Sequence, residues 1–377
     1  MIDTTNNRVN NLILHLSLID NVGPSTINTI VQSFDKLRMS GGGEIDLYSL
    51  NISDLQNIFG ISYQKAKLIV EGLKDRSILE KELNLIEKNK IQITTILDSG
   101  YPSFLKEIEV PPSILYYRGN LQNLDRSLSV VGSRAASSYG QRVIKKIVPE
   151  LSLDKLGMGG DYGFVIVSGG AFGIDTLAHK ETLAFGGRTV AVLGSGLLKM
   201  YPYQNTKMFE EIIEKNGAVI SPFNLNMEPL PGNFPARNRI VSGLSQGVLV
   251  VQAAKTSGAL ITAKYALEQG REVFAVPGLI DDPLSEGCHE LIKNGAKLVT
   301  NIEDILQEFD ITYRQKSTFE IKQEITNPIL KACIEPVSLE EIHISTGIEM
   351  DKLQIQLFDL QIEGKIRQNF VGFWERI

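Results

Sequence analysis

The chain has 377 residues, of which 43% are hydrophobic and 22% charged, and its formal net charge is -6. That composition is typical of a globular protein of two or three domains, and the negative charge argues against a broadly basic, nucleic-acid-coating surface. No apolar run approaches the ~20 residues of a membrane span, and residues 1–7 lack signal-peptide features. We therefore expect a cytoplasmic protein without a membrane partner. Two cysteines and four histidines, at these spacings, indicate no disulfide, metal site or cofactor.

Residues 1–80 predict a domain of short helices. Ile27, Ile30 and Val31 recur at helical spacing after a Gly-Pro-Ser turn, and a second helix–turn–helix pattern surrounds Gly60. The pattern resembles SAM-like or helix-hairpin-helix modules, which bind the DNA backbone through their turns. A purely structural bundle explains it equally well, so both readings stay open. Residues 81–125 predict a connecting extension in which residues 91–97 alternate like a strand.

From residue 126 to 310, apolar β-branched runs alternate with helical runs. Strands are predicted at residues 128–131, 164–167, 189–193, 218–221, 248–251 and 273–276. The alternation predicts an α/β fold, namely an extended Rossmann-like, doubly wound, mostly parallel sheet with helices on both faces. Turns at the carboxyl ends of such strands line one crevice.

The C-terminal part predicts a separate small domain. Residues 311–328 are polar and predict a linker. Residues 329–377 predict short helices, a capping box formed by Ser338 and Glu341, a helix over 350–362 and a β-hairpin around Gly372, which together are typical of a winged helix. Residues 330–377 contain five Lys and Arg against eight Asp and Glu. Since duplex binding needs several basic contacts, we expect this domain to bind protein instead.

Four turns of the α/β part carry the candidate DNA-binding residues. Each joins an apolar strand or loop to a helix start, where N–H groups and guanidinium forks favour phosphate. The candidates, in chain order, are Ser133, Arg134, Ser168, Gly169, Gly170, Phe172, Gly173, Asn233, Arg237, Asn238, Arg239, Lys255, Thr256, Ser257 and Gly258.

Several of these residues have a structural alternative. For Arg134 the alternative to phosphate binding is a salt bridge to a neighbouring helix. For the glycine turn the alternative is close packing of strand and helix without a ligand. One of Arg237 and Arg239 is expected to be a structural fork to a buried carboxylate. Tyr201 and Tyr203, which follow a predicted strand, stack on bases or pack in the core.

Asp175 and His179 lie four residues apart on a predicted helix, as an acid/base pair could. The better interpretation is that Asp175 favours the helix start while His179 packs. No nucleophile with triad-like partners stands near them, so the sequence does not predict catalysis.

Together these segments resemble the DprA/Smf family, DNA-processing protein A of bacterial transformation. The matching stretches are residues 130–134, 168–179, 191–205, 233–239, 257–262 and 270–278. The resemblance implies a protein that binds single-stranded DNA, protects incoming DNA, loads RecA recombinase in natural transformation, forms homodimers through the Rossmann-like domain, and is not an enzyme. Relatives often carry a basic residue where this chain has Phe172, so a phosphate partner is lost there and a stacking ring gained.

The alternative is a nucleotide-binding or nucleotide-hydrolysing protein. The core also resembles the LOG family, whose signature ends in a catalytic glutamate, but Tyr265 stands at that position. The turn after residue 131 does not fit G-x-G-x-x-G, and no Walker A loop is present, so neither a dinucleotide nor ATP is predicted.

Overall fold

The computed structural model describes residues 4–39, 47–152, 163–309, 327–333, 335–362, 364–369 and 372–376. The chain divides into two compact units, Met1–Thr312 and Tyr313–Ile377. The predicted linker at 311–328 lies outside the described residues except for its last two positions. None of the helices in the described ranges combines the length and apolar character that a membrane span requires.

A nine-stranded sheet organises the first unit, with the order β1-β2-β6-β5-β4-β3-β7-β8-β9. The strands are β1 (Gln92–Thr95), β2 (Ile114–Gly119), β3 (Ser127–Val131), β4 (Val165–Ser168), β5 (Thr189–Val192), β6 (Ala218–Ser221), β7 (Gly247–Val250), β8 (Glu272–Ala275) and β9 (Lys297–Leu298). The β1–β2 and β2–β6 pairs are antiparallel. Every other pair of neighbouring strands, from β6 to β9 in the sheet order, is parallel. The chain moves from β3 outward through β4 to one side, then returns to place β7 on β3's other side.

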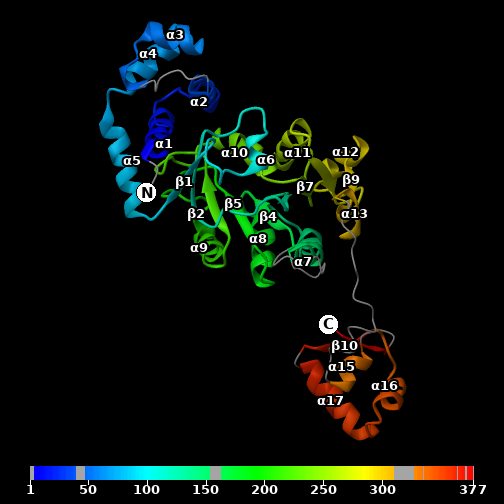
Figure 1. Cartoon of the computed structure of the whole chain (residues 1–377). Helices are drawn as coiled ribbons and strands as arrows, with labels where there is room; N and C mark the ends of the chain where they lie inside the picture. The colour runs from blue at the N-terminus through cyan, green and yellow to red at the C-terminus, as the bar shows by residue number, and fades with distance from the viewer. Residues whose placement is uncertain are drawn as a thin grey trace. The chain divides into compact units, whose positions relative to one another are not determined.

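Helices cover both faces, which confirms the predicted α/β fold with a mostly parallel sheet. One face carries α7 (Ser138–Ser152), α8 (Ile174–Ala184) and α9 (Thr206–Glu214), and the other carries α6 (Ser103–Lys106), α10 (Asn233–Gly243) and α11 (Gly258–Glu268) (Figure 1). The remaining short elements are η2 (Tyr203–Asn205), α12 (Glu286–Lys293), α13 (Glu303–Leu306) and η3 (Gln307–Phe309). Strand residues such as Val167, Val190 and Val248 are fully buried between these layers.

All six strands predicted between residues 126 and 310 are present within one residue at either end. The first strand of the connecting extension is also present, as β1. β2 and β9 were not predicted. β2 follows Pro111 and Pro112, which are typical of a turn and hid the strand. Its antiparallel pairing with β6 depends on partners about 100 residues away in the sequence. β9 has only two residues and no periodicity to detect.

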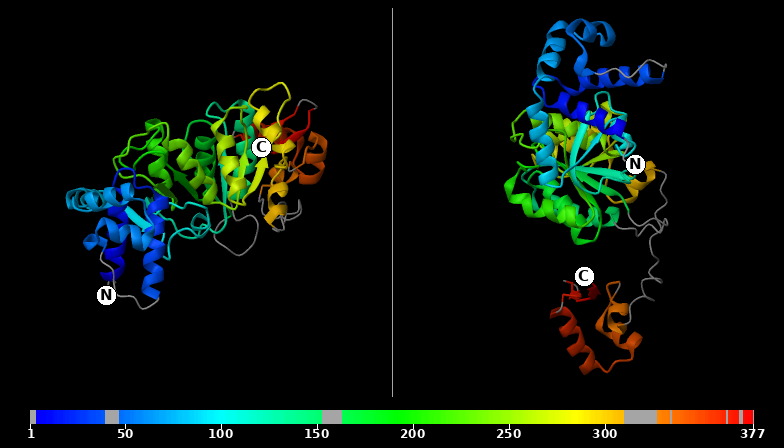
Figure 2. Two further views of the ribbon diagram at one scale, coloured as in Figure 1. Left: turned by 90° about the horizontal axis from the view of Figure 1, so that it is seen from above. Right: turned by 60° about the vertical axis from the view of Figure 1, so that its left-hand side comes forward.

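The N-terminal helices pack against the β1 end of the sheet (Figures 1 and 2). They are α1 (Thr4–Ser17), α2 (Pro24–Met39), η1 (Leu47–Ser49), α3 (Ile52–Phe59), α4 (Tyr63–Gly72) and α5 (Arg76–Lys88). Both predicted helix–turn–helix pairs form, with Gly60 in the left-handed region at φ 63°. The predicted boundary at residue 80 falls inside α5. Buried residues of these helices, such as Leu14 and Ile69, belong to one hydrophobic core with sheet residues such as Val219.

The second unit contains α15 (Pro328–Ala332), α16 (Leu339–Thr346), α17 (Met350–Ile362), and the antiparallel strands β10 (Ile366–Gln368) and β11 (Trp374–Arg376). The capping box of Ser338 and Glu341 is formed, and α17 has the predicted ends. The apolar core of the second unit includes Ile342, Leu353 and Leu357.

Candidate functional site

A pocket of about 640 Å³ opens where the chain switches direction, at the carboxyl ends of β3 and β7. Adjacent loops diverge at such a switch point and leave a crevice for ligand. Its walls come from the ends of β3 and β4, the first turns of α10, and the β7–α11 turn. Of the predicted residues, those lining it are Ser133, Arg134, Gly169, Arg237, Asn238, Thr256, Ser257 and Gly258.

Arg134 supplies an exposed positive charge to the pocket. Its guanidinium carbon lies 5.6 Å from the centre of the Phe234 ring, a cation–π arrangement. Within the described ranges no carboxylate forms an ion pair with it. The guanidinium is therefore held in place by an aromatic face while its donors stay available. Phe234 was not among the predicted site residues, although it lies in the same segment, three residues before Arg237.

Arg237 supplies a second, buried positive charge. Only 4% of it is exposed, and its Nη1 donates to the carbonyl of Val192, 2.7 Å away. The side chain packs directly on Gly169, where a Cβ would lie 1.9 Å from Nη1. Gly169 is required here because any side chain would displace the guanidinium.

Asp175 lies beside this arginine and holds the β4–α8 turn. Its Oδ2 accepts the N–H groups of Gly169 (3.1 Å) and Ala171 (3.4 Å). Burial raises the pKa of Asp175 to about 6, although the charge of Arg237 opposes that rise. Burial also lowers the pKa of Arg237 to about 10. The N–H groups of Gly169 and Ala171, which the sequence offered to a phosphate through the glycine turn, are therefore taken by a side chain of the protein.

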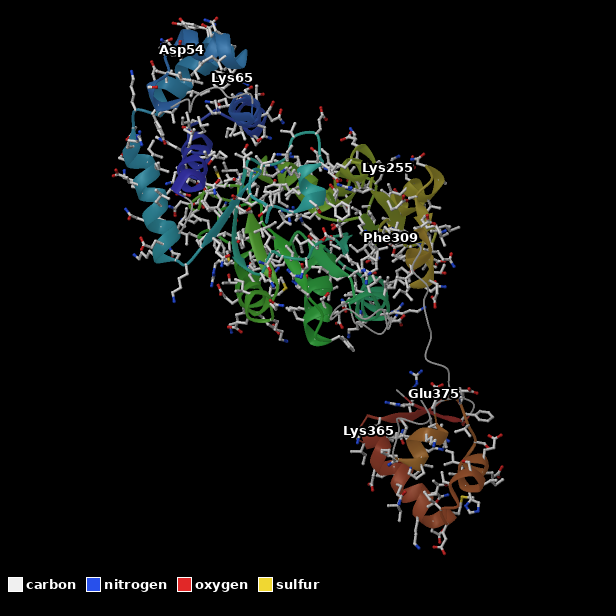
Figure 3. All side chains as sticks on the ribbon, in the orientation of Figure 1. Asp54, Lys65, Lys255, Phe309, Lys365 and Glu375 are labelled. Atoms are coloured by element: carbon white, nitrogen blue, oxygen red, sulfur yellow. The ribbon has the colours of Figure 1, made fainter. Side chains whose placement is uncertain are left out.

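The β7–α11 turn brings a helix start to the pocket. The Ser257 hydroxyl caps α11 by accepting the N–H of Ala259 at 3.3 Å. The Asn238 amide donates to the carbonyl of Gly258 at 3.3 Å and so ties α10 to this helix start. The positive end of the α11 dipole thus faces the pocket. Lys255 is exposed nearby and does not line the pocket (Figure 3).

The remaining predicted residues support the pocket from outside it. Ser168 is buried and donates to the carbonyl of Val130 at 2.6 Å. Gly170 accepts from the Asn205 amide at 3.0 Å, and Gly173 begins α8 at φ 76°. Asn233 donates to the Glu228 carbonyl at 3.2 Å.

Phe172 is 41% exposed on the β4–α8 turn and does not line the pocket. His179 is fully buried and bonded to Thr189 at 2.7 Å, so it packs as expected. Burial lowers its pKa to about 3. Cys288 and Cys333 are buried and unbridged. Nowhere in the described ranges do three potential metal ligands cluster.

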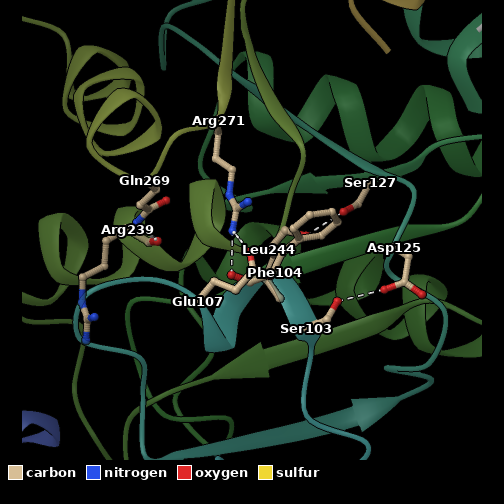
Figure 4. A network of polar contacts seen from close by, with 9 residues as sticks. All are labelled: Ser103, Phe104, Glu107, Asp125, Ser127, Arg239, Leu244, Gln269 and Arg271. Atoms are coloured by element: carbon tan, nitrogen blue, oxygen red, sulfur yellow. Dashed lines mark hydrogen bonds and ion pairs between the residues drawn. The ribbon is translucent and has the colours of Figure 1, made fainter. Parts of the chain in front are cut away.

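Arg239 points away from the pocket. Its guanidinium donates to the carbonyl of Val110, and its own carbonyl accepts from the Gln269 amide at 2.9 Å. Figure 4 shows Gln269 beside Arg239, and near them Arg271, whose guanidinium lies over the Phe104 ring. The structure therefore separates the two arginines of α10: Arg237 lines the pocket, and Arg239 anchors the segment that precedes β2.

The fold and the pocket define an α/β protein with a cationic pocket at the switch point of a mostly parallel sheet. The family model of DNA recombination-mediator protein A matches residues 92–310. DNA processing protein DprA of Streptococcus pneumoniae is 46% identical over 225 residues, which is 59% of this chain and 76% of that protein. Protein Smf of Escherichia coli is 45% identical over 233 residues, which is 62% of this chain and 60% of that protein.

Two solved structures extend the comparison. DprA from Streptococcus pneumoniae has a TM-score of 0.65 at 36% identity, over 82% of this chain and 99% of that one. DprA from Helicobacter pylori, described by its single-stranded DNA binding mode, has a TM-score of 0.51 at 29% identity, over 59% of this chain and 98% of that one. The chain therefore belongs to the DNA recombination-mediator protein A family, to which the DprA and Smf proteins belong.

Proposed function

We propose that this protein binds single-stranded DNA through the switch-point pocket, with a backbone phosphate on Arg134. The observation that carries the proposal is the exposed guanidinium of Arg134, which is fixed over Phe234 and has no carboxylate partner in the described ranges. Guanidinium groups bind phosphate in bidentate fashion. The relative from Helicobacter pylori is described as binding single-stranded DNA, which supports this ligand over a free nucleotide.

Arg237 and the start of α11 add positive potential to the pocket, although the Arg237 side chain is almost fully buried. The Nε–H of Arg237 is buried and has no acceptor within the described part of the chain. A phosphate oxygen in the pocket would provide one, and burial makes the attraction stronger than at the surface. The N-terminal dipole of α11 adds to the same positive potential.

For Arg239 and Lys255 we propose different roles. Arg239 is committed to Val110 and Gln269, so it acts as the structural arginine of the pair. Its partner is a carbonyl and not the buried carboxylate that the sequence suggested. Lys255 is exposed at the pocket's rim, where it attracts the DNA backbone at long range and its contribution is screened by salt.

Binding, and not catalysis, is the proposed activity. Asp175 is the carboxylate of the pocket, and it accepts two backbone N–H groups. The Ser257 hydroxyl caps α11, and His179 is buried against Thr189. Tyr265 stands where the LOG signature has its glutamate, and it does not line the pocket. The nucleotide-hydrolysing alternative therefore lacks its acid.

On the family's description as a recombination mediator, we further propose that the protein protects incoming DNA and delivers RecA recombinase to it during natural transformation. Homodimers formed through the α/β domain would place two pockets on one strand and raise avidity. For the second unit we propose a winged helix that contacts protein, since acidic residues outnumber basic ones over 330–377. The N-terminal helices remain either a DNA contact or a structural module.

Fluorescence anisotropy tests the proposal directly. Labelled single-stranded and duplex oligonucleotides of one sequence are titrated with the full chain over a series of salt concentrations. We expect preference for the single strand and a steep loss of affinity with salt. Equal binding to duplex, or no binding to either, contradicts the proposal, and a screen of free nucleotides would then test the alternative. Binding without RecA delivery would restrict the function to protection.

A further inference from the structure

A run of aromatic rings leads away from the pocket along the carboxyl edge of the sheet. The Tyr201 ring lies 5.9 Å from the Phe234 ring, centre to centre, at an interplanar angle of 59°. The Tyr203 ring lies 6.0 Å from the Tyr201 ring at 83°. Arg134 sits over the other end, on Phe234. We name the three rings, Phe234, Tyr201 and Tyr203, the aromatic rail.

The two tyrosines of the rail are exposed where an ordinary packing role would bury them. Tyr201 is 38% exposed and Tyr203 is 60% exposed. Burying an aromatic ring removes 150–250 Å² from water. Two rings left open beside a pocket therefore offer apolar area to a ligand.

The backbone that carries the rail is held rigid. The Gly196 and Leu198 N–H groups donate to the carbonyls of Met227 (2.8 Å) and Leu225 (3.0 Å). The Asn205 amide, at the end of η2, donates to Gly170 and to Thr176. A ligand therefore meets rings already in position and does not pay to order a loop.

The two tyrosines of the rail face a different part of a nucleic acid strand from the pocket. Neighbouring strands lie ~4.8 Å apart, so β5, which precedes the rail, is about 14 Å from β7, which precedes the α11 turn. Lys199, the basic residue that precedes the rail, is paired with Glu228 at 2.8 Å. Positive charge is thus available at Arg134 and neutralised near the tyrosines. Phosphate is favoured at one end and an uncharged flat group at the other.

We propose that the aromatic rail is a base-stacking subsite for the nucleotides next to the one whose phosphate Arg134 holds. This inference rests on the proposed function. Every base has a π face, so the subsite accepts any sequence. In a duplex the faces of the bases are already covered by their neighbours, so the rail also gives the protein its preference for single strands.

The test compares Tyr203→Ala with Tyr203→Phe on two oligonucleotides of equal length and charge. One bears thymine throughout, and the other is abasic. Loss of one stacked base lowers affinity about 5- to 160-fold. We expect that loss for Tyr203→Ala on the thymine strand only. Tyr203→Phe keeps the ring and should keep wild-type affinity. Duplex affinity should not change in either variant.

Phe185→Ala is the matched control. Phe185 is 48% exposed and follows α8 directly before β5 begins, at the opposite edge of the sheet. It should bind both strands as wild type does. If Tyr203→Ala fails to fold by circular dichroism, Tyr203→Leu replaces it, since leucine keeps apolar bulk but has no π face.

The outcomes separate this inference from the function on which it rests. If Arg134→Ala weakens binding while Tyr203→Ala leaves the thymine strand unaffected, the rail is refuted and the pocket stands. Equal losses on the thymine and abasic strands also refute stacking. If the wild-type protein binds no single strand at all, both proposals fall.

Discussion

The Arg134→Ala variant tests the chemistry of the pocket most directly. The residue is exposed, its guanidinium contacts the Phe234 ring, and it has no ion pair within the described ranges. Its removal should therefore change binding without a large change in the free energy of unfolding. The fold of the variant can be checked by its urea denaturation midpoint.

The expected loss follows from one charge-assisted phosphate contact. A hydrogen bond to a charged group contributes ~1.5–3 kcal/mol, which corresponds to about 13- to 160-fold in affinity. An exposed guanidinium is already well hydrated, so we expect a loss of affinity of about 13-fold, at the lower end of that range. One phosphate contact fewer should also reduce the slope of log affinity against log salt by ~0.7 for a single strand. Arg134→Lys keeps the charge and loses the fork, so it should keep the slope and recover part of the affinity.

The assay is anisotropy with a labelled single strand over a salt series, and Arg142→Ala is the matched control. Arg142 is also an exposed arginine beside an aromatic ring, 6.0 Å from the centre of Tyr139, and it lies on α7 outside the pocket. We expect wild-type affinity and slope for Arg142→Ala. If the two alanine variants behave alike, general surface charge explains the binding and the pocket assignment is refuted.

Three further predictions concern the pocket's support. Gly173→Ala forces φ 76° on alanine and puts a Cβ 2.2 Å from the Ser133 carbonyl oxygen, so it should lower the free energy of unfolding by at least ~1–3 kcal/mol; an unchanged urea midpoint would contradict this. Arg239→Ala, which loses the bond to Val110, should cost ~1.5–3 kcal/mol of stability and leave single-strand affinity intact; a loss of affinity as large as that of Arg134→Ala would reinstate it as a DNA contact. In the folded protein the pKa of Asp175 is about 6, whereas its ordinary value is 3.8. The free energy of unfolding should therefore fall by about 3 kcal/mol as the pH rises from 3.8 to about 6. Urea denaturation across this pH range should show no such fall for Asp175→Asn.

The six strands between residues 126 and 276, and the turns that follow them, could be predicted from local pattern alone. Buried parallel strands read as continuous β-branched runs, and each run from residue 126 to 276 is bounded by glycine or helical sequence. Once the sheet is parallel, chain order alone sends Arg134, Gly169 and Ser257 to the same carboxyl edge. Two helices of the second unit were equally predictable, because the capping box marks the start of α16 and a long helical run defines α17.

The directions in which side chains point at the site could not be predicted from local pattern. Arg237 and Arg239 are two residues apart on α10, so they point about 200° apart around the helix. Which of them meets the pocket depends on how α10 is rotated, and Ile240, Val241 and Leu244 set that rotation by packing on the sheet. The glycine turn was ambiguous for a similar reason, since only the tertiary structure brings Asp175 to its N–H groups.

The sequence by itself thus determined the six central strands, their mostly parallel pairing and the edge at which the candidate residues gather, since these follow from periodicity and from the geometry of parallel strands. Only the tertiary structure decided that Arg134 stays free over Phe234, that Arg239 turns to Val110, and that Tyr201 meets a ring 33 positions further along the chain. Contacts between distant segments depend on how helices are rotated and loops are pinned against the sheet, and no local pattern records that packing.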